Sequence, residues 1–246
     1  MNYFDLYREV KSDFNSSKKQ YADALVSRWF YRPAGFLFTP LFIKAGLSGN
    51  QVSLVGLLIG WAANILLAFG GGLLVLGAIF YVLFAVVDFC DGNVARYRKT
   101  STNNGRLVDY FVGASVSTFT PLFVAVGVSQ GSELLLGLSA EYYIVIGALA
   151  SLVNMLAKNG DANYKLEKAK IGKEIESFSS AGEGKKRISF NDLIAGTTHI
   201  ALLVLVVLGF AEVFVYLVFA MASASLFVFV KKLVTKGPRE LGKQKL

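Results

Sequence analysis

The sequence predicts an all-α membrane protein with six transmembrane helices and an N-terminal cytoplasmic interfacial helix region. Two observations on the 246-residue chain support this fold class. Hydrophobic residues make up 54% of the chain and charged residues 17%, which is more apolar surface than a soluble domain of this length can bury. The apolar residues also gather into runs without the alternation of apolar and polar residues that strands of a membrane barrel require.

The first 48 residues form the predicted interfacial region. Within it, the stretch Asp23–Gly46 mixes five Trp and Phe residues with two arginines and a lysine. Pro33 and Pro40 interrupt this stretch, so it is unsuited to spanning a bilayer. Aromatic and basic residues in this mixture are typical of a helix that lies at the membrane surface.

Residues 49–232 form the predicted transmembrane domain. A bilayer core of roughly 30 Å requires about 20 helical residues. Six apolar runs approach or reach this length, and the chain between the fourth and fifth, residues 158–191, is a charged loop that we expect to be partly disordered. Residues 233–246 form a basic tail. The six runs are Val52–Gly70, Leu73–Asp91, Leu107–Val128, Tyr142–Lys158, Leu193–Phe210 and Val213–Val230.

The basic residues predict the orientation of these helices. All 25 Lys and Arg residues lie before the first run, between Arg96 and Arg106, between Lys158 and Arg187, or from Lys231 onward. The turns at the opposite ends of the helices instead carry acidic residues, Glu133, Glu141 and Glu212. Because basic loops stay on the cytoplasmic side, the sequence predicts a multi-pass integral membrane protein whose termini and charged loops are cytoplasmic.

Three aspartates stand where the second run ends and the third begins. Asp88 and Asp91 are three residues apart and therefore share one face of a helix, and Asp109 follows at a similar predicted depth on the next helix. Unpaired carboxylates at a membrane edge would repel one another. Hard oxygen ligands of this kind suit Mg²⁺, Mn²⁺ or Ca²⁺, and a bound divalent cation would relieve the repulsion.

Ion pairing with nearby basic residues is the alternative explanation of these aspartates. Arg96, Arg98, Lys99 and Arg106 are all close in sequence. Against simple pairing, Gly92 and Gly105 flank the aspartates, and glycine destabilises a helix by about 1 kcal/mol relative to alanine. These glycines give a ligand room to approach. Arg96 offers a phosphate a bidentate fork, so the residues together favour a pyrophosphate site.

The spacing Asp88-x2-Asp91-Gly92-x2-Ala95-Arg96-x8-Gly105-x3-Asp109 resembles the signature of the CDP-alcohol phosphotransferase family. The resemblance implies a divalent-metal-dependent membrane transferase of phospholipid or related lipid biosynthesis. It would move a phospho-alcohol group from a CDP-alcohol to an acceptor hydroxyl and release CMP. By the same resemblance the three aspartates would bind one or two Mg²⁺ or Mn²⁺ ions. Gly92, Ala95, Arg96 and Gly105 would lie beside the substrate, and the protein would be a homodimer.

One position departs from the family pattern, which continues with a fourth aspartate where this chain has Gly113. In the family that aspartate contributes to the metal site and is the expected general base, and glycine can do neither. The catalytic base is therefore unknown. His199 is one candidate, since a buried histidine can accept a proton near neutral pH. The alternative is that His199 only hydrogen-bonds between helices.

Two classes of function remain open at this stage. The first is an active transferase with an acceptor alcohol of unknown identity, at least one of its substrates being a lipid. The second is a catalytically impaired or noncatalytic nucleotide-binding homologue, which the glycine at position 113 favours. A transporter is less consistent with ionisable residues that cluster at one membrane face. We expect no nucleic-acid partner, because the basic residues follow the membrane topology.

Overall fold

The computed structural model describes residues 2–16, 26–131, 138–171 and 190–241. The described residues form helices joined by turns, and no β-strand occurs among them. The elements are α1 (Tyr3–Ser16), a π-helical turn η2 (Ser27–Tyr31), α2 (Arg32–Lys44), α3 (Gly49–Ala68), α4 (Leu73–Tyr97), α5 (Asn103–Val128), α6 (Ala140–Ile171), α8 (Phe190–Val207) and α9 (Ala211–Leu241).

Local sequence signals define where the helices next to the aspartates begin. Ser48 caps α3 in a reciprocal arrangement, in which its hydroxyl accepts from the backbone of Gln51 and the Gln51 side chain accepts from the Ser48 backbone. Thr102 caps α5 by accepting a 3.0 Å hydrogen bond from the backbone N–H of Gly105. Both caps lie at the end of the bundle that carries the aspartates, so they fix the first turns from which the site is built.

The helices pack around a shared apolar core. α3 lies against both α4 and α5, while α6 pairs with α9 and also contacts α5. Gly60 lets α3 approach α5 closely, since a Cβ atom there would lie 2.6 Å from a methyl group of Val116. The core draws buried residues from six helices, among them Ala63, Tyr81, Val116, Val124, Tyr143, Leu202 and Val215. This interlocking holds α4 and α5 in a fixed relation although they touch each other little.

Five described helices are long and apolar enough to cross a membrane: α3, α4, α5, residues Ala140–Tyr164 of α6, and residues Ala211–Thr235 of α9. The protein is therefore a multi-pass integral membrane protein. The sixth predicted run, Leu193–Phe210, coincides with α8, whose described apolar part, Thr197–Val207, is shorter than a span. Six spans thus stay a prediction.

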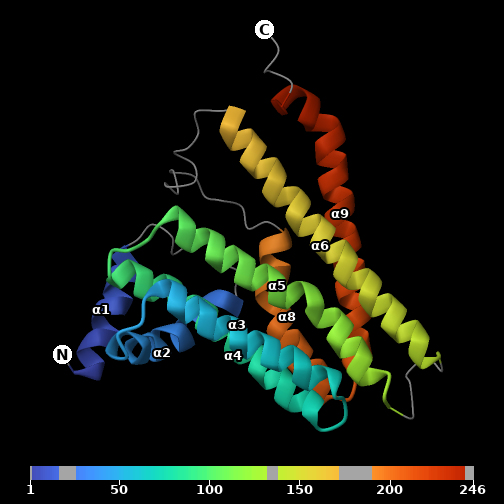
Figure 1. Cartoon of the computed structure of the whole chain (residues 1–246), viewed down its shortest axis with the longest axis horizontal. Coiled ribbons are helices and arrows are strands. Elements are labelled where there is room, and N and C mark those ends of the chain that lie inside the picture. The colour runs from blue at the N-terminus through green and yellow to red at the C-terminus, as the bar shows by residue number, and fades with distance from the viewer. Residues whose placement is uncertain (1, 17–25, 132–137, 172–189, 242–246) are drawn as a thin grey trace.

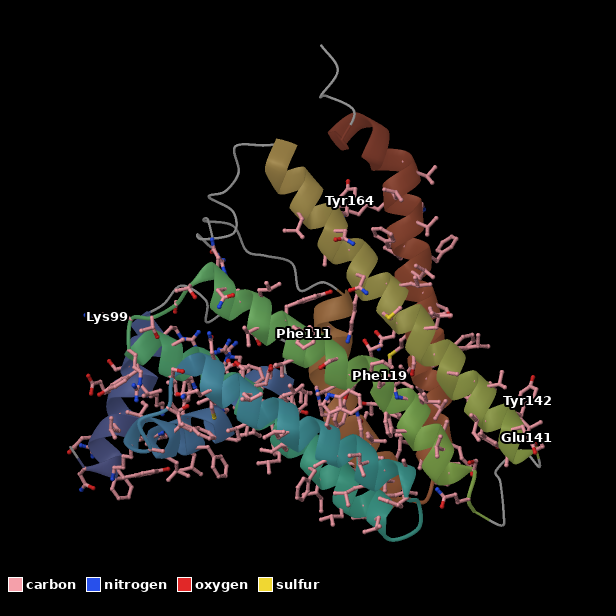
Figure 2. The ribbon with its side chains drawn as sticks, viewed as in Figure 1. Lys99, Phe111, Phe119, Glu141, Tyr142 and Tyr164 are labelled. Carbon is pink, nitrogen blue, oxygen red and sulfur yellow. The ribbon has the colours of Figure 1, made fainter. Side chains whose placement is uncertain are left out.

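The arrangement of the connections agrees with the pattern of charges. Figure 1 shows α1, α2 and the α4–α5 connection together at one end of the molecule and the α3–α4 turn at the other. In Figure 2, Lys99 marks the first of these ends, and Glu141 and Tyr142 at the start of α6 mark the opposite one. Basic and acidic connections are thus separated along the helices, as the sequence predicts, while the side of the membrane on which each lies stays a prediction.

The structure extends two helices beyond their predicted limits. α6 continues to Ile171, so the first part of the loop predicted at 158–191 is helical. Residues 172–189, the rest of that predicted loop except its last two residues, lie outside the described part of the chain. α9 continues to Leu241, into the predicted tail. Near these ends Lys232 pairs with Asp161 at 3.6 Å and lies 4.3 Å from the ring centroid of Tyr164, which ties α9 to α6.

Candidate metal and nucleotide site

The three aspartates converge in the folded chain as predicted. Asp88 and Asp91 project from α4 and Asp109 from α5, and one carboxylate oxygen of each lies within 4.8 Å of the others. The three side chains differ in solvent exposure: Asp91 is buried, Asp88 is half-buried and Asp109 is exposed. Three carboxylate oxygens at this spacing, open on one side, match the oxygen ligands that Mg²⁺ and Mn²⁺ prefer. The geometry therefore fits a divalent cation that is reached from the exposed side.

A serine on α3 orients the buried carboxylate. The hydroxyl of Ser53 donates a 2.5 Å hydrogen bond to Oδ2 of Asp91, and the serine is 3% exposed. This contact restrains the orientation of the Asp91 carboxylate. Outer contacts of this type fix the direction of metal-binding groups. Ser53 is a residue of the candidate site that the sequence analysis missed, because 38 residues separate it from Asp91.

Arg96 lies along α4 beside the cluster. Its guanidinium rests over Gly92, where a Cβ atom would come within 3.3 Å of Nη1. Gly92 thus makes room for the arginine as well as for any ligand. The guanidinium is part-buried and lies one turn beyond Asp91 on the same helix. A fork of N–H donors next to a carboxylate cluster is suited to hold a phosphate bridged to a metal.

A buried polar chain sets the position of Arg96. Nη2 of Arg96 donates to Oδ1 of Asn93 at 2.6 Å, and Nδ2 of Asn93 donates to the Thr39 hydroxyl at 3.1 Å. The Thr39 hydroxyl donates in turn to the backbone oxygen of Gly35 at 2.6 Å. Thr39 is fully buried and Asn93 is 4% exposed. The arginine is therefore connected to α2, and neither Asn93 nor Thr39 stands out in the sequence.

Two of the four basic residues named for the ion-pair alternative, Arg98 and Lys99, give it no support. Arg98 turns away and donates to the backbone oxygen of Ile43 at 3.4 Å. Lys99 is exposed and occupies a left-handed turn, with φ 56°, between α4 and α5. Neither residue makes a described ion pair with the aspartates. Arg96 acts on Asp91 electrostatically, but a single cation cannot neutralise three carboxylates.

Two other signature residues permit close packing at the site. Ala95 faces α3, where a Cβ atom on Gly49 would lie 3.0 Å from the Ala95 methyl group. A Cβ atom on Gly105 would lie 3.3 Å from Oδ1 of Asn50, at the start of α3. The small residues at 95 and 105 thus bring the first turns of α3 against α4 and α5. Their predicted place beside a substrate stays a prediction.

The backbone at Gly113 borders open space. A Cβ atom built there would meet no atom within 4 Å outside its own helical neighbours. The candidate base His199 is packed against the rings of Tyr81 at 4.3 Å and Tyr31 at 5.9 Å between centroids, and the charge of Lys158 acts on it. Its Nδ1 is buried without a described hydrogen-bond partner. The structure does not bring His199 into contact with the carboxylates, and these contacts favour a packing role.

A match to a known family identifies the group of proteins to which the chain is related. The family model described as CDP-alcohol phosphatidyltransferase matches residues 47–221, from just before α3 into α9. The chain belongs to the CDP-alcohol phosphatidyltransferase family. No curated protein matches the chain. A member of this family is a membrane transferase that moves phospho-alcohol groups in lipid synthesis, and its substrates are a CDP-alcohol and an alcohol.

Membership in the family gives the carboxylate cluster a chemical context. The family uses divalent metal ions, and the three aspartates of this family member form a group that could bind one. All of the cluster, together with Ser53, Asn93 and Arg96, lies inside the matched residues. Thr39 precedes the matched residues. The series of hydrogen bonds that positions Arg96 therefore includes a residue outside the match.

Proposed function

We propose that this chain transfers the phospho-alcohol group of a CDP-alcohol to an acceptor hydroxyl and releases CMP, with a divalent cation held by Asp88, Asp91 and Asp109. The observation that carries the proposal is the convergence of these carboxylates next to an oriented arginine. Mg²⁺ or Mn²⁺ would supply Lewis-acid polarisation of the pyrophosphate. CDP-diacylglycerol is the first donor to test, because the site lies at one end of a membrane bundle.

The chain's own residues would bind and orient the donor. Arg96, fixed by Asn93, is placed to hold a phosphate of the pyrophosphate through its N–H fork. Ser53 would keep the Asp91 carboxylate in its orientation within the cluster. These contacts exist before substrate arrives, so the donor would bind to groups that are already oriented, which favours its affinity.

The acceptor would approach through the open space beside Gly113. A bond forms between its hydroxyl oxygen and the β-phosphorus, the bond from that phosphorus to the CMP oxygen breaks, and the hydroxyl proton passes to solvent. A positioned base typically contributes about 10² to 10⁴ in rate. We therefore expect turnover that is slow for the reaction class, since glycine stands at the expected base position.

Several finer features belong to the same proposal. Both termini and the site are cytoplasmic, as the distribution of Lys and Arg indicates. The α1–α2 region lies along the membrane surface, where its exposed Trp29 and Phe30 would contact lipid. The protein is a homodimer, as the family resemblance implies.

A noncatalytic nucleotide-binding role is the second candidate function, and the open space at Gly113 favours it. One experiment separates the two. The purified full-length chain in lipid nanodiscs is supplied with Mg²⁺ or Mn²⁺ and a panel of CDP-alcohols and acceptors, and released CMP is measured. Release that requires both substrates and the cation supports the transferase. Binding of a CDP-alcohol without any release supports the second candidate.

A further inference from the structure

The structure places a lysine ammonium next to the position of the absent fourth aspartate. The Ser117 hydroxyl on α5 donates a 2.5 Å hydrogen bond to the backbone oxygen of Gly113. Nζ of Lys158 on α6 donates a 2.5 Å hydrogen bond to that same hydroxyl. Two consecutive hydrogen bonds therefore connect the ammonium to residue 113, on the helix that carries Asp109.

The surrounding contacts hold this lysine in place. Asn154, one turn before it on α6, donates to the backbone oxygen of Ser117 at 3.2 Å. The Tyr110 hydroxyl on α5 donates to the backbone oxygen of Lys158 at 3.3 Å. α6 is thus fastened to α5 on both sides of the ammonium. Contacts between α5 and α6 therefore fix the position of Nζ.

Lys158 has no counter-ion among the residues that the structure describes. The acidic residue one turn further along α6, Asp161, pairs with Lys232 of α9 instead. Lys158 is part-buried inside a bundle of apolar helices, where an unpaired charge is costly and commonly marks a functional position. Its charge is therefore available to a negatively charged ligand or to repel a cation.

We infer that the Lys158 ammonium takes the place of a second metal ion, so that the site holds one divalent cation at Asp88, Asp91 and Asp109. This inference rests on the proposed function. A second cation near position 113 would lack the carboxylate that glycine cannot supply. It would also meet the positive charge of Lys158 in a medium that screens charge weakly. The fixed ammonium would instead supply a second positive charge beside position 113.

The inference predicts how position 113 and Lys158 depend on each other. Gly113→Asp has space for its side chain, and the new carboxylate is expected to pair with the ammonium, which two hydrogen bonds connect to the backbone oxygen of residue 113. Gly113→Asp alone is then expected to leave the number of bound cations at one. In Gly113→Asp combined with Lys158→Met, the ammonium is absent and the new carboxylate can bind metal. This double variant is expected to bind two cations.

Counting bound Mn²⁺ tests this directly. The full-length chain in nanodiscs is titrated with Mn²⁺, and free Mn²⁺ is followed by its electron paramagnetic resonance signal. The unsubstituted chain is expected to bind one ion and the double variant two. Gly113→Asp with Lys158→Arg keeps the positive charge and is expected to bind one. Gly113→Asp with Lys231→Met is the matched control, since Lys231 is an exposed lysine of α9, and is also expected to bind one.

The outcomes separate this inference from the proposed function. Two ions on the unsubstituted chain would overturn the inference and leave the transferase proposal intact. One ion on the double variant would also overturn it, because Lys158 would then not be what excludes the second cation. No bound ion on the unsubstituted chain would remove the metal centre of the proposed function and the inference with it. Size-exclusion profiles that match the unsubstituted chain show that each variant is folded.

Discussion

Replacing Asn93 by leucine tests whether the buried hydrogen bonds from α2 fix the position of Arg96, the residue proposed to bind a phosphate. Leucine has a similar volume but neither accepts from Arg96 nor donates to Thr39, contacts of 2.6 Å and 3.1 Å. A hydrogen bond to a charged group contributes about 1.5–3 kcal/mol, and about 1.4 kcal/mol corresponds to a tenfold change in an equilibrium constant. We therefore expect KM for the CDP-alcohol to rise by about tenfold or more.

The split between KM and kcat identifies the mechanism of this effect. Arg96 would hold the phosphate in both the ground state and the transition state, so a loss of its orientation weakens both alike and raises KM while kcat changes little. The assay is CMP release at saturating acceptor, with the CDP-alcohol titrated. Thermal unfolding of the same samples reports whether the substitution also destabilises the bundle.

Asn64→Leu is the matched control for this experiment. Asn64 is a buried asparagine that bonds to the backbone oxygen of Val116 at 3.1 Å and accepts from Thr120 at 2.9 Å. It lies on α3, four helical turns from the start of the helix near the site, so its loss should lower stability at unchanged KM. An unchanged KM in folded Asn93→Leu, or an equal rise in Asn64→Leu, would refute the positioning role.

Three further outcomes follow from the geometry. Ser53→Ala removes the 2.5 Å bond to Asp91 and is expected to weaken Mn²⁺ binding by about tenfold in a titration, while Ser53→Thr retains the hydroxyl and most of the affinity. Gly60→Ala places a methyl group 2.6 Å from a valine of α5 and should lower the free energy of unfolding by about 1–3 kcal/mol, seen as a lower Tm. Cysteines introduced at Gly72 and Ser101 should react with impermeant maleimide from opposite sides of the membrane, Ser101→Cys from the cytoplasmic side, and the reverse labelling would contradict the topology.

Much of the architecture could be predicted from the sequence because membrane helices are determined by local properties. The runs that became α3, α4 and α5 are apolar on all faces, and a bilayer core requires every backbone polar group in them to be satisfied within a helix. The convergence of the three aspartates could be predicted for a similar reason. Asp88 and Asp91 share a helix face, and a short connection returns the chain at the same depth to Asp109.

The residues that orient the site could not be predicted, because their roles arise from contacts between distant helices. Ser53 reaches Asp91 across 38 residues, and Thr39 reaches Asn93 across 54. Serine, threonine and asparagine are common in membrane helices, where they usually serve packing. Nothing in the local pattern separates Asn93, which contacts Arg96, from Asn64, which bridges two helices in the core.

Position 113 is a second case in which distant contacts matter. The sequence identifies a metal ligand and a general base as what glycine at this position cannot supply. The open space at this position has room for the side chain of Gly113→Asp as far as volume is concerned. Lys158, 45 residues away in the chain, lies beside the same position through Ser117 and would pair with the new carboxylate. On the inference drawn above, the charge of Lys158, and not the space at Gly113, decides what the substitution does.

CMP release by the full-length chain and by Asp91→Asn tests the central claim most directly. Asp91 is the buried member of the cluster, and its replacement removes one ligand charge without changing side-chain size. The account predicts release that requires a CDP-alcohol, an acceptor alcohol and Mg²⁺ or Mn²⁺, and that falls by at least about a hundredfold in Asp91→Asn. Release that persists in a metal chelator, or that is equal in the two proteins, would contradict it.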